Sequence, residues 1–261
     1  MQVSGAMRGT SATAAGTRPN PGPLEHPRTQ VATAVALALA CTATLAIAFV
    51  LARLAAGDLG LVARALVFAL LGAGLLAWLA ARHHAAPTFG AANAVTLARG
   101  VLTLDLLAVL GSAPNVVLAW SSVALALLAL ALDGVDGRVA RSLGEASAFG
   151  ARFDMETDAV LILVLCALAW QQGKAGAWIL LAGALRYLFV AAGFALPWLA
   201  STLPPSRRRQ AACVVQIASL IVCLLPPVPP PASGVVALVG LVVLLGSFSV
   251  DVGWLARHAR A

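Results

Sequence analysis

The chain has 261 residues, of which 61% are hydrophobic and 10% are charged, and its mean hydropathy is +0.94. Soluble domains carry about a quarter charged residues, so this composition argues against a soluble enzyme and against a disordered chain. The net charge is +7, but a basic groove for nucleic acid needs a water-soluble surface, and we expect no nucleic-acid partner. The composition predicts a polytopic membrane protein, an all-α helical bundle whose basic excess lies in cytoplasmic loops.

The first 30 residues are rich in Gly, Pro, Ser and Thr and carry scattered arginines. A segment of this composition cannot bury an apolar core, so residues 1–30 are predicted to be a disordered cytoplasmic tail. A cleaved signal peptide is the alternative. It is disfavoured because the polar stretch is too long and the apolar run that follows is long enough to span a bilayer.

Eight apolar runs follow, each close to the roughly 20 residues that a membrane helix needs. They cover about 31–52, 61–81, 93–113, 115–133, 155–172, 176–200, 211–228 and 234–255. Arginines concentrate in the tail, in alternate loops and at the C-terminus, whereas the other loops carry only Arg53, Arg64 and Lys174. The positive-inside rule therefore places both termini, and the polar segment from Asp133 to Asp158, in the cytoplasm.

A few polar or reactive residues lie inside the apolar runs. The four cysteines form no C-x-x-C pair and are predicted to be small core residues; they are Cys41, Cys166, Cys213 and Cys223. Asp105 and Asp251 are interpreted as polar contacts within the bundle or as part of a subunit interface.

Four of the seven aspartates lie within 26 residues. Asp133 and Asp136 are three apart at the end of one apolar run, and Asp154 and Asp158 are four apart at the start of the next, so each pair shares a helix face. If the two helices pack antiparallel, four carboxylates converge. Such a cluster needs a cation to offset the repulsion. Oxygen ligands without His or Cys suit Mg²⁺ or Mn²⁺, and four carboxylates can hold two ions.

The residues around these aspartates complete the pattern D-x-x-D-G-x-x-A-R-x8-G-x-x-x-D-x-x-x-D. Its eight fixed positions are Asp133, Asp136, Gly137, Ala140, Arg141, Gly150, Asp154 and Asp158. The segment resembles the signature of the CDP-alcohol phosphatidyltransferase family. Upstream, Asn93, Thr96 and Arg99 share a helix face and resemble the N-x-x-T-x-x-R that opens the first core helix of that family. The resemblance covers about residues 88–258. It divides the chain into the tail 1–30, two additional transmembrane helices within 31–85, and a six-helix domain at 86–261.

The resemblance implies a reaction of phospholipid biosynthesis. A CDP-linked donor, such as CDP-diacylglycerol, gives its phosphatidyl group to an alcohol, and CMP leaves. Asp133, Asp136 and Asp154 are implied to bind one metal; Asp133, Asp154 and Asp158 are implied to share a second. Asp158 is also the implied base for the acceptor hydroxyl. The residues implied to hold the donor are Asn93, Thr96, Arg99, Gly137, Ala140, Arg141 and Ser147. The resemblance further implies a homodimer, and we expect it in the cell (inner) membrane with its active site facing the cytoplasm.

Two segments depart from the family pattern. Between the last two aspartates stands Met155-Glu156-Thr157, where many members have apolar residues or Pro. Glu156 is expected to face away from the cluster because it is two residues from each aspartate. Where the family often has a G-K-x-x-T element, this chain has Ser206-Arg207-Arg208-Arg209-Gln210.

The acceptor alcohol is not identified by the sequence. Arg186 lies inside an apolar run, where an unpaired charge is costly and indicates a functional residue. With Ser206, Arg207, Arg208 and Arg209 it is a candidate anion pocket for a phosphorylated acceptor. Alternatively, the arginine run only marks the cytoplasmic side and contacts lipid headgroups.

A transporter or channel is the alternative function, since intramembrane Asp and Arg residues often mark an ion path. This alternative explains the apolar runs. It does not explain the eight-position motif.

Overall fold

The computed structural model describes residues 27–55, 57–83, 90–143, 147–201, 203–204 and 206–259, with side chains except at 27–30, 81–83, 136–143, 148 and 200. Over these residues the chain is all-helical, as predicted, and has no strand. Its eight α-helices are α1 (Pro27–Leu54), α2 (Leu59–His83), α3 (Ala91–Val109), α4 (Val116–Leu143), α5 (Ala148–Gln171), α6 (Leu180–Ala195), α7 (Arg207–Leu224) and α8 (Pro230–His258). Residues 1–26 of the predicted tail lie outside the described residues, while 27–30 already belong to α1.

Each of the eight predicted spans coincides with one of these helices. Six helices are long and apolar enough to cross a membrane by length and composition, namely α1, α2, α3, α4, α6 and α8. The other two are more highly charged, because α5 carries Arg152 and three acidic residues in its first half and α7 begins with three arginines. The predicted span 176–200 is not one continuous helix: the 3-10 helices η1 (Ala177–Ile179) and η2 (Pro197–Ala200) flank α6.

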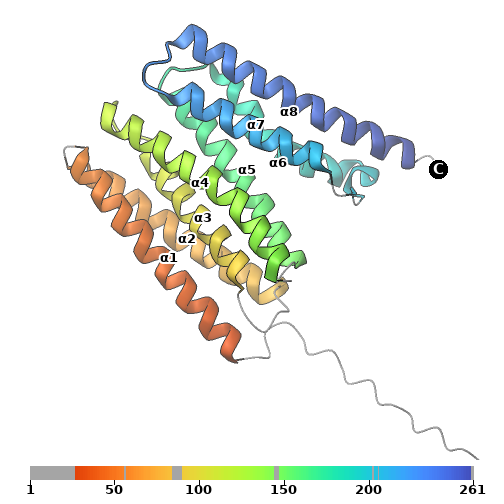
Figure 1. Cartoon of the computed structure of the whole chain (residues 1–261), viewed down its shortest axis with the longest axis horizontal. Helices are drawn as coiled ribbons and strands as arrows, with labels where there is room; N and C mark the ends of the chain where they lie inside the picture. The colour runs from red at the N-terminus through yellow and green to blue at the C-terminus, as the bar shows by residue number, and fades with distance from the viewer. Residues whose placement is uncertain are drawn as a thin grey trace, which may run out of the picture.

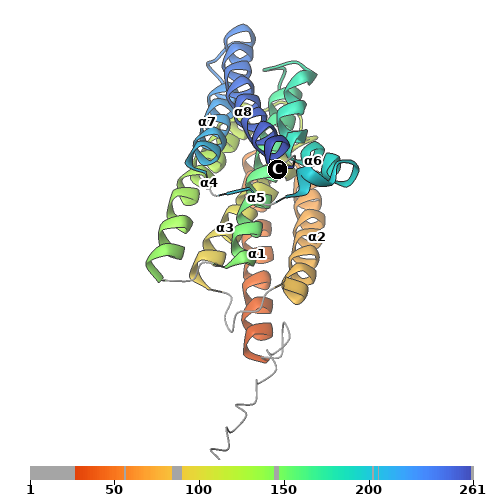
Figure 2. The same ribbon diagram turned by 90° about the vertical axis from the view of Figure 1, so that its right-hand side faces the viewer.

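The centre of the bundle is formed by α3 and α5, which pack against each other (Figures 1 and 2). Helix α3 also contacts α1, α2 and α4, while α5 also contacts α6 and α7; α7 and α8 form a hairpin at the side opposite α1 and α2. The contact between α5 and α6 is close at Gly183, where an added Cβ would lie 2.7 Å from the Leu163 Cα. Along α5, Leu161, Leu165 and Leu168 are fully buried, which places this helix face in the main core.

Polar contacts tie the loops together at the end of the bundle where α1 joins α2. Arg64 donates to the Ala108 carbonyl at 2.8 Å, to the Ser112 hydroxyl at 2.6 Å and to Asp58 at 3.3 Å. The Ser112 hydroxyl donates to Asp58 at 2.7 Å, and this hydrogen bond is the main cause that lowers the pKa of Asp58. Lys174 donates to the carbonyls of Leu225, Pro226 and Val228, which joins the end of α5 to the α7–α8 loop. Arg64 and Lys174 thus hydrogen-bond to other segments of the chain, and the Arg53 guanidinium lies 6.0 Å from the centroid of the Phe49 ring.

The segment from Asp133 to Asp158 differs from the prediction. The apolar runs predict helices that end near residue 133 and begin near residue 155, whereas α4 continues to Leu143 and α5 already begins at Ala148. Asp133 and Asp136 consequently lie inside α4, and Asp154 and Asp158 lie in the second and third turns of α5. The prediction assumed that each helix ends where its apolar run ends. A helix can continue beyond the membrane into water as long as no residue breaks it, because its backbone hydrogen bonds do not depend on an apolar environment.

Candidate active site

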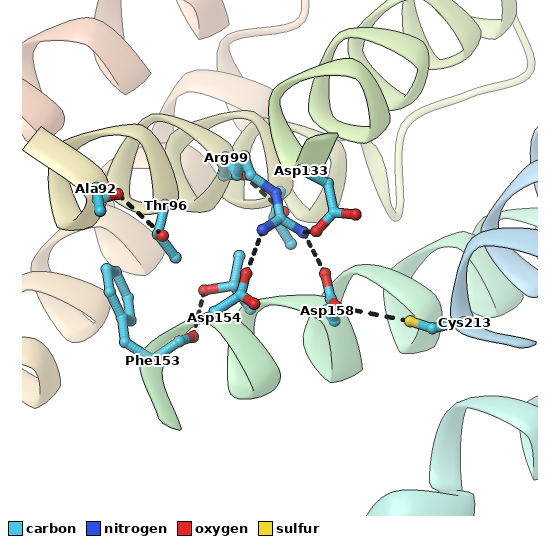
Figure 3. A network of polar contacts seen from close by, with 10 residues as sticks. Ala92, Thr96, Arg99, Asp133, Phe153, Asp154, Asp158 and Cys213 are labelled. Atoms are coloured by element: carbon cyan, nitrogen blue, oxygen red, sulfur yellow. Dashed lines mark hydrogen bonds and ion pairs between the residues drawn. The ribbon is translucent and has the colours of Figure 1, made fainter. Parts of the chain in front are cut away.

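The aspartates of the motif meet where α4 and α5 pass beside α3. Carboxylate oxygens of Asp133, Asp154 and Asp158 all lie within 4.8 Å of one another (Figure 3). Asp154 and Asp158 project from one face of α5 because four residues make about one turn, and Asp133 faces them from α4. The side chains of Asp133 and Asp158 are 23% and 20% exposed, whereas that of Asp154 is 41% exposed. The cluster is therefore most open to solvent beside Asp154.

The guanidinium of Arg99, on α3, lies among these three carboxylates (Figure 3). Its Nη1 donates to Asp154 at 2.5 Å, and its Nη2 lies 2.9 Å from Asp133 and also pairs with Asp158. The Arg99 side chain is fully buried. When all four groups are ionised, three negative charges and one positive charge leave a net charge of two negative. Arg99 was predicted to hold the donor, and the structure places it in the same cluster as the predicted metal ligands.

The first turns of α3 and α5 pack closely at Gly150, a fixed position of the motif. An added Cβ there would lie 2.8 Å from the Asn93 Oδ1 and 3.1 Å from the Ser147 Oγ. Ser147 caps α5, since its hydroxyl accepts from the Gly150 N–H at 3.0 Å. Asn93 and Thr96 are both buried on the face of α3 that also carries Arg99. Glycine at 150 thus leaves room for the Asn93 and Ser147 side chains, two predicted donor-binding residues, against the first turn of α5.

Four other predicted site residues lie in the last third of α4. Asp136, Gly137, Ala140 and Arg141 are part of the helix, but their side chains lie outside the described residues. Their predicted roles in metal and donor binding stay predictions.

Three of the five predicted acceptor residues, Arg186, Arg208 and Arg209, have acidic neighbours. Arg186 pairs with Glu156, so this carboxylate faces Arg186 rather than the aspartate cluster, and Arg186 also contacts the Met155 sulfur at 2.9 Å. The remaining acceptor candidates lie at the start of α7. There Arg208 donates to Asp251 and Ser247 on α8, Arg209 lies 3.6 Å from Asp251, Arg207 is exposed, and Ser206 is the N-cap. Asp251, interpreted from sequence as a bundle contact or an interface residue, is a bundle contact in this structure.

Cys213, which was predicted to be a core residue, contacts the site. The Cys213 thiol on α7 donates to the Asp158 Oδ2 at 3.5 Å (Figure 3). Asp158 is therefore held on one side by Arg99 and on the other by a thiol. No sequence signal singles out Cys213 among the four cysteines, because its proximity to Asp158 depends on how α7 packs against α5.

The ligand atoms that this cluster offers suit a hard divalent cation. The three carboxylates offer oxygen ligands from two helices within the span that one or two ions can bridge. The net charge of two negative that remains after Arg99 is counted would be compensated by such an ion. The residues present therefore fit Mg²⁺ or Mn²⁺.

Residues 89–246, more than half of the chain, match the family described as CDP-alcohol phosphatidyltransferase. The chain belongs to this family. The matched segment contains α3 to α7 and the first part of α8, and so all the elements that form the carboxylate cluster. No curated protein and no solved structure matches the chain.

Members of the CDP-alcohol phosphatidyltransferase family transfer phosphatidyl-type groups from CDP-alcohols and generally depend on a divalent metal. With six helices among the described residues that are apolar enough to cross a membrane, this chain is a multi-pass membrane transferase. Membership of this transferase family argues against the alternative function of a transporter or channel. Helices α1 and α2 precede the matched residues.

Proposed function

We propose that the protein transfers a phosphatidyl group from a CDP-linked lipid, CDP-diacylglycerol or a close analogue, to a small alcohol and releases CMP. One observation supports this most directly: three carboxylates of the family motif lie within 4.8 Å of one another around the buried Arg99. A site of this kind concentrates charges of both signs at one point. Phosphoryl transfer relies almost entirely on positioning and charge stabilisation, which such a site provides.

The donor is proposed to bind with its diphosphate beside the cluster. Asn93, Thr96 and Arg99 contribute from α3, and Ser147 from the start of α5. Gly137, Ala140 and Arg141 are assigned to the nucleotide and diphosphate by their place in the motif. Asp133, Asp136, Asp154 and Asp158 would hold one or two divalent cations, most simply two Mg²⁺ or Mn²⁺ ions, and these would neutralise negative charge on the diphosphate and on the leaving CMP.

Asp158 is proposed to take the proton of the acceptor hydroxyl. The acceptor oxygen then forms a bond to the phosphorus of the phosphatidyl group, the bond from that phosphorus to the CMP oxygen breaks, and CMP leaves with the electron pair. The ion pair with Arg99 and the hydrogen bond from Cys213 fix the direction of the Asp158 carboxylate. Held in this direction, the carboxylate can orient the acceptor hydroxyl as well as accept its proton.

The acceptor is proposed to carry a phosphate, as glycerol phosphate and inositol phosphate do. Arg186 and the Ser206–Arg209 segment are the cationic groups available for it. In the bundle each has an acidic neighbour, Glu156 for Arg186 and Asp251 for Arg208, so the acceptor phosphate has to compete with these carboxylates. Guanidinium groups favour this exchange because they bind phosphate through two parallel hydrogen bonds.

The setting is proposed from charge and family membership. The protein lies in the cell (inner) membrane, and the arginine-rich end of the helical bundle, which holds the carboxylate cluster, faces the cytoplasm. The protein is proposed to act as a homodimer among membrane lipids, and α1 and α2 to be additional membrane helices beside a six-helix core.

The test is CMP release by the purified full-length protein from CDP-diacylglycerol, with Mg²⁺ and with excess chelator. Each reaction is run with glycerol phosphate, inositol phosphate, free glycerol and free inositol as acceptors. We expect CMP release only with metal and only with a suitable acceptor. The variants Asp133→Asn and Asp154→Asn are expected to lose activity and metal binding together.

Asp58→Asn is the matched control, because Asp58 is also ion-paired but lies at the opposite end of the bundle and before the family segment. It is expected to retain activity. Full CMP release in excess chelator would refute the metal-dependent mechanism. Absence of CMP release with every acceptor would refute the proposed donor.

A further inference from the structure

A cavity of about 340 Å³ lies between α1, α2, α3 and α5, on the side of the bundle away from α7 and α8. Its walls are mostly apolar, with Leu37 on α1, Leu76 on α2, Leu104 on α3 and Val160 on α5 among them. Protein interiors leave few voids larger than a water molecule. A cavity of this size falls instead in the range of small-molecule sites.

Two walls of the cavity belong to the helices that form the carboxylate cluster. On α5, Phe153 and Thr157 line it, and they directly precede Asp154 and Asp158 in the sequence. On α3, Gly100 lines it and follows Arg99. The cavity and the cluster therefore lie on adjacent faces of the same two helices. Figure 3 shows Phe153 and Thr96 at the end of the polar network away from Cys213.

The lining changes in character along the cavity. At the α5 wall the lining includes Thr157, which directly precedes Asp158, and Glu156, whose carboxylate pairs with Arg186. Toward α1 and α2 the lining is leucine, alanine, phenylalanine and glycine, apart from Cys41 and Thr44 on α1. A ligand that matches this gradient has a polar part beside the carboxylates and an apolar part that extends toward α1 and α2.

We propose that the cavity receives one acyl chain of the CDP-lipid donor and that α1 and α2, which precede the family segment, serve as its outer walls. This inference rests on the proposed function, because the donor must be a lipid. A CDP-diacylglycerol carries its acyl chains a few bonds from the reacting phosphorus, so a chain enters an apolar space that adjoins the cluster without displacing the nucleotide. The two helices thereby select among donors by chain length.

Two variants fill the cavity from different walls. Gly100→Leu adds a side chain from α3, where an added Cβ meets no heavy atom within 4 Å, and Ala40→Phe adds one from α1. Gly74→Leu is the matched control, because its Cβ also meets nothing within 4 Å but Gly74 is exposed on α2 and does not line the cavity. None of these residues belongs to the carboxylate cluster.

The assay is CMP release with a long-chain and a short-chain CDP-diacylglycerol. A chain that enters from the bilayer leaves one apolar environment for another, so the gain is in packing and the effect is moderate. We expect both filling variants to raise the KM for the long-chain donor by about tenfold and to leave the KM for the short-chain donor unchanged. The Gly74→Leu control is expected to match the wild type with both donors. Equal KM changes for both chain lengths in both filling variants would overturn the proposal.

A labelling experiment on the wild-type protein does not depend on the variants folding. CDP-diacylglycerol with a photoreactive group at the end of one acyl chain is bound, irradiated, and the labelled peptides are identified. We expect label on residues 37–44 or 68–79, removed by excess unlabelled CDP-diacylglycerol but not by excess phosphatidylcholine with the same chains. Label elsewhere, or equal competition by phosphatidylcholine, would overturn the proposal, the latter because it indicates a site for bulk lipid. CMP release in the same preparation separates the two failures: activity without this labelling refutes only the acyl-chain site, and absence of activity refutes the proposed function itself.

Discussion

Arg99→Ala is expected to destabilise the bundle strongly, because it leaves three carboxylates without their shared cation. The Arg99 side chain is fully buried and pairs with Asp133, Asp154 and Asp158. Removing one partner of a buried ion pair costs about 3–5 kcal/mol. Asp154 is 41% exposed and its share is screened by water, whereas the other two carboxylates are about one-fifth exposed. We therefore expect a loss near the lower end, about 3 kcal/mol.

The measurement is the free energy of unfolding in mixed detergent micelles, with and without Mg²⁺. A ligand that binds only the folded state stabilises it by about 2.7 kcal/mol at a hundred times its Kd. Mg²⁺ should stabilise Arg99→Ala more than the wild type, since no guanidinium then shares the carboxylate oxygens. Arg99→Lys, which keeps the charge but not the planar fork, is expected to fall between the two. Arg152→Ala removes an exposed arginine from the same helix as Asp154 and should change stability by less than about 0.5 kcal/mol.

Two results would contradict this reasoning. If Arg99→Ala is as stable as Arg152→Ala, the guanidinium does not compensate the cluster. If Mg²⁺ stabilises the wild type and Arg99→Ala equally, the ion does not bind at the carboxylates that Arg99 contacts.

Three further predictions concern turnover. Asp158→Asn should lower kcat by about 10²–10⁴-fold, as loss of a general base does. The Kd of the CDP-lipid donor, measured by direct binding, should change only a few-fold. A collapse of donor binding would show that Asp158 acts chiefly as a metal ligand. Arg186→Ala should raise the KM of a phosphorylated acceptor by tens-fold, given that a hydrogen bond to a charged group is worth roughly 1.5–3 kcal/mol, with the donor KM as internal control; a preference of the wild type for an uncharged alcohol would reject the phosphate pocket. Cys213→Val should lower kcat by about two- to tenfold, the worth of one hydrogen bond, and Cys213→Ser, which keeps a donor, should retain most of it; equal kcat values for the two variants would deny the thiol a role in orienting Asp158.

The family and the membrane class followed from the sequence because both depend on local patterns. Apolar runs of sufficient length predict membrane helices, and each of the eight runs contains an α-helix in the structure; six of these helices are long and apolar enough to cross a membrane. The motif fixes residue types at fixed separations, and Asp154 and Asp158 share a face of α5 because 3.6 residues make one turn. The motif requires glycine at position 150 without showing why, and the close approach of the Asn93 and Ser147 side chains to Gly150 gives a reason.

The helix ends near the motif were placed wrongly for a physical reason. Hydropathy reports where an apolar run stops, and Asp133 stands at that point. The backbone continues as α4 to Leu143, because no residue after Asp133 interrupts its helical hydrogen bonds. All four aspartates therefore lie within helices rather than at helix ends.

Contacts between residues far apart in the chain were decided only by the tertiary structure. The sequence shows that Arg99 shares a face with Asn93 and Thr96, but its place among the carboxylates depends on how α3 is rotated and shifted against α4 and α5, and Arg99 is 55 residues from Asp154. The same holds for Cys213 beside Asp158, also 55 residues apart, and for the pairing of Arg186 with Glu156. Helical periodicity determines the face on which a side chain lies. The partner that it meets is set by the packing of one helix on another, which sums many weak contacts along both helices and leaves no local signal in the sequence.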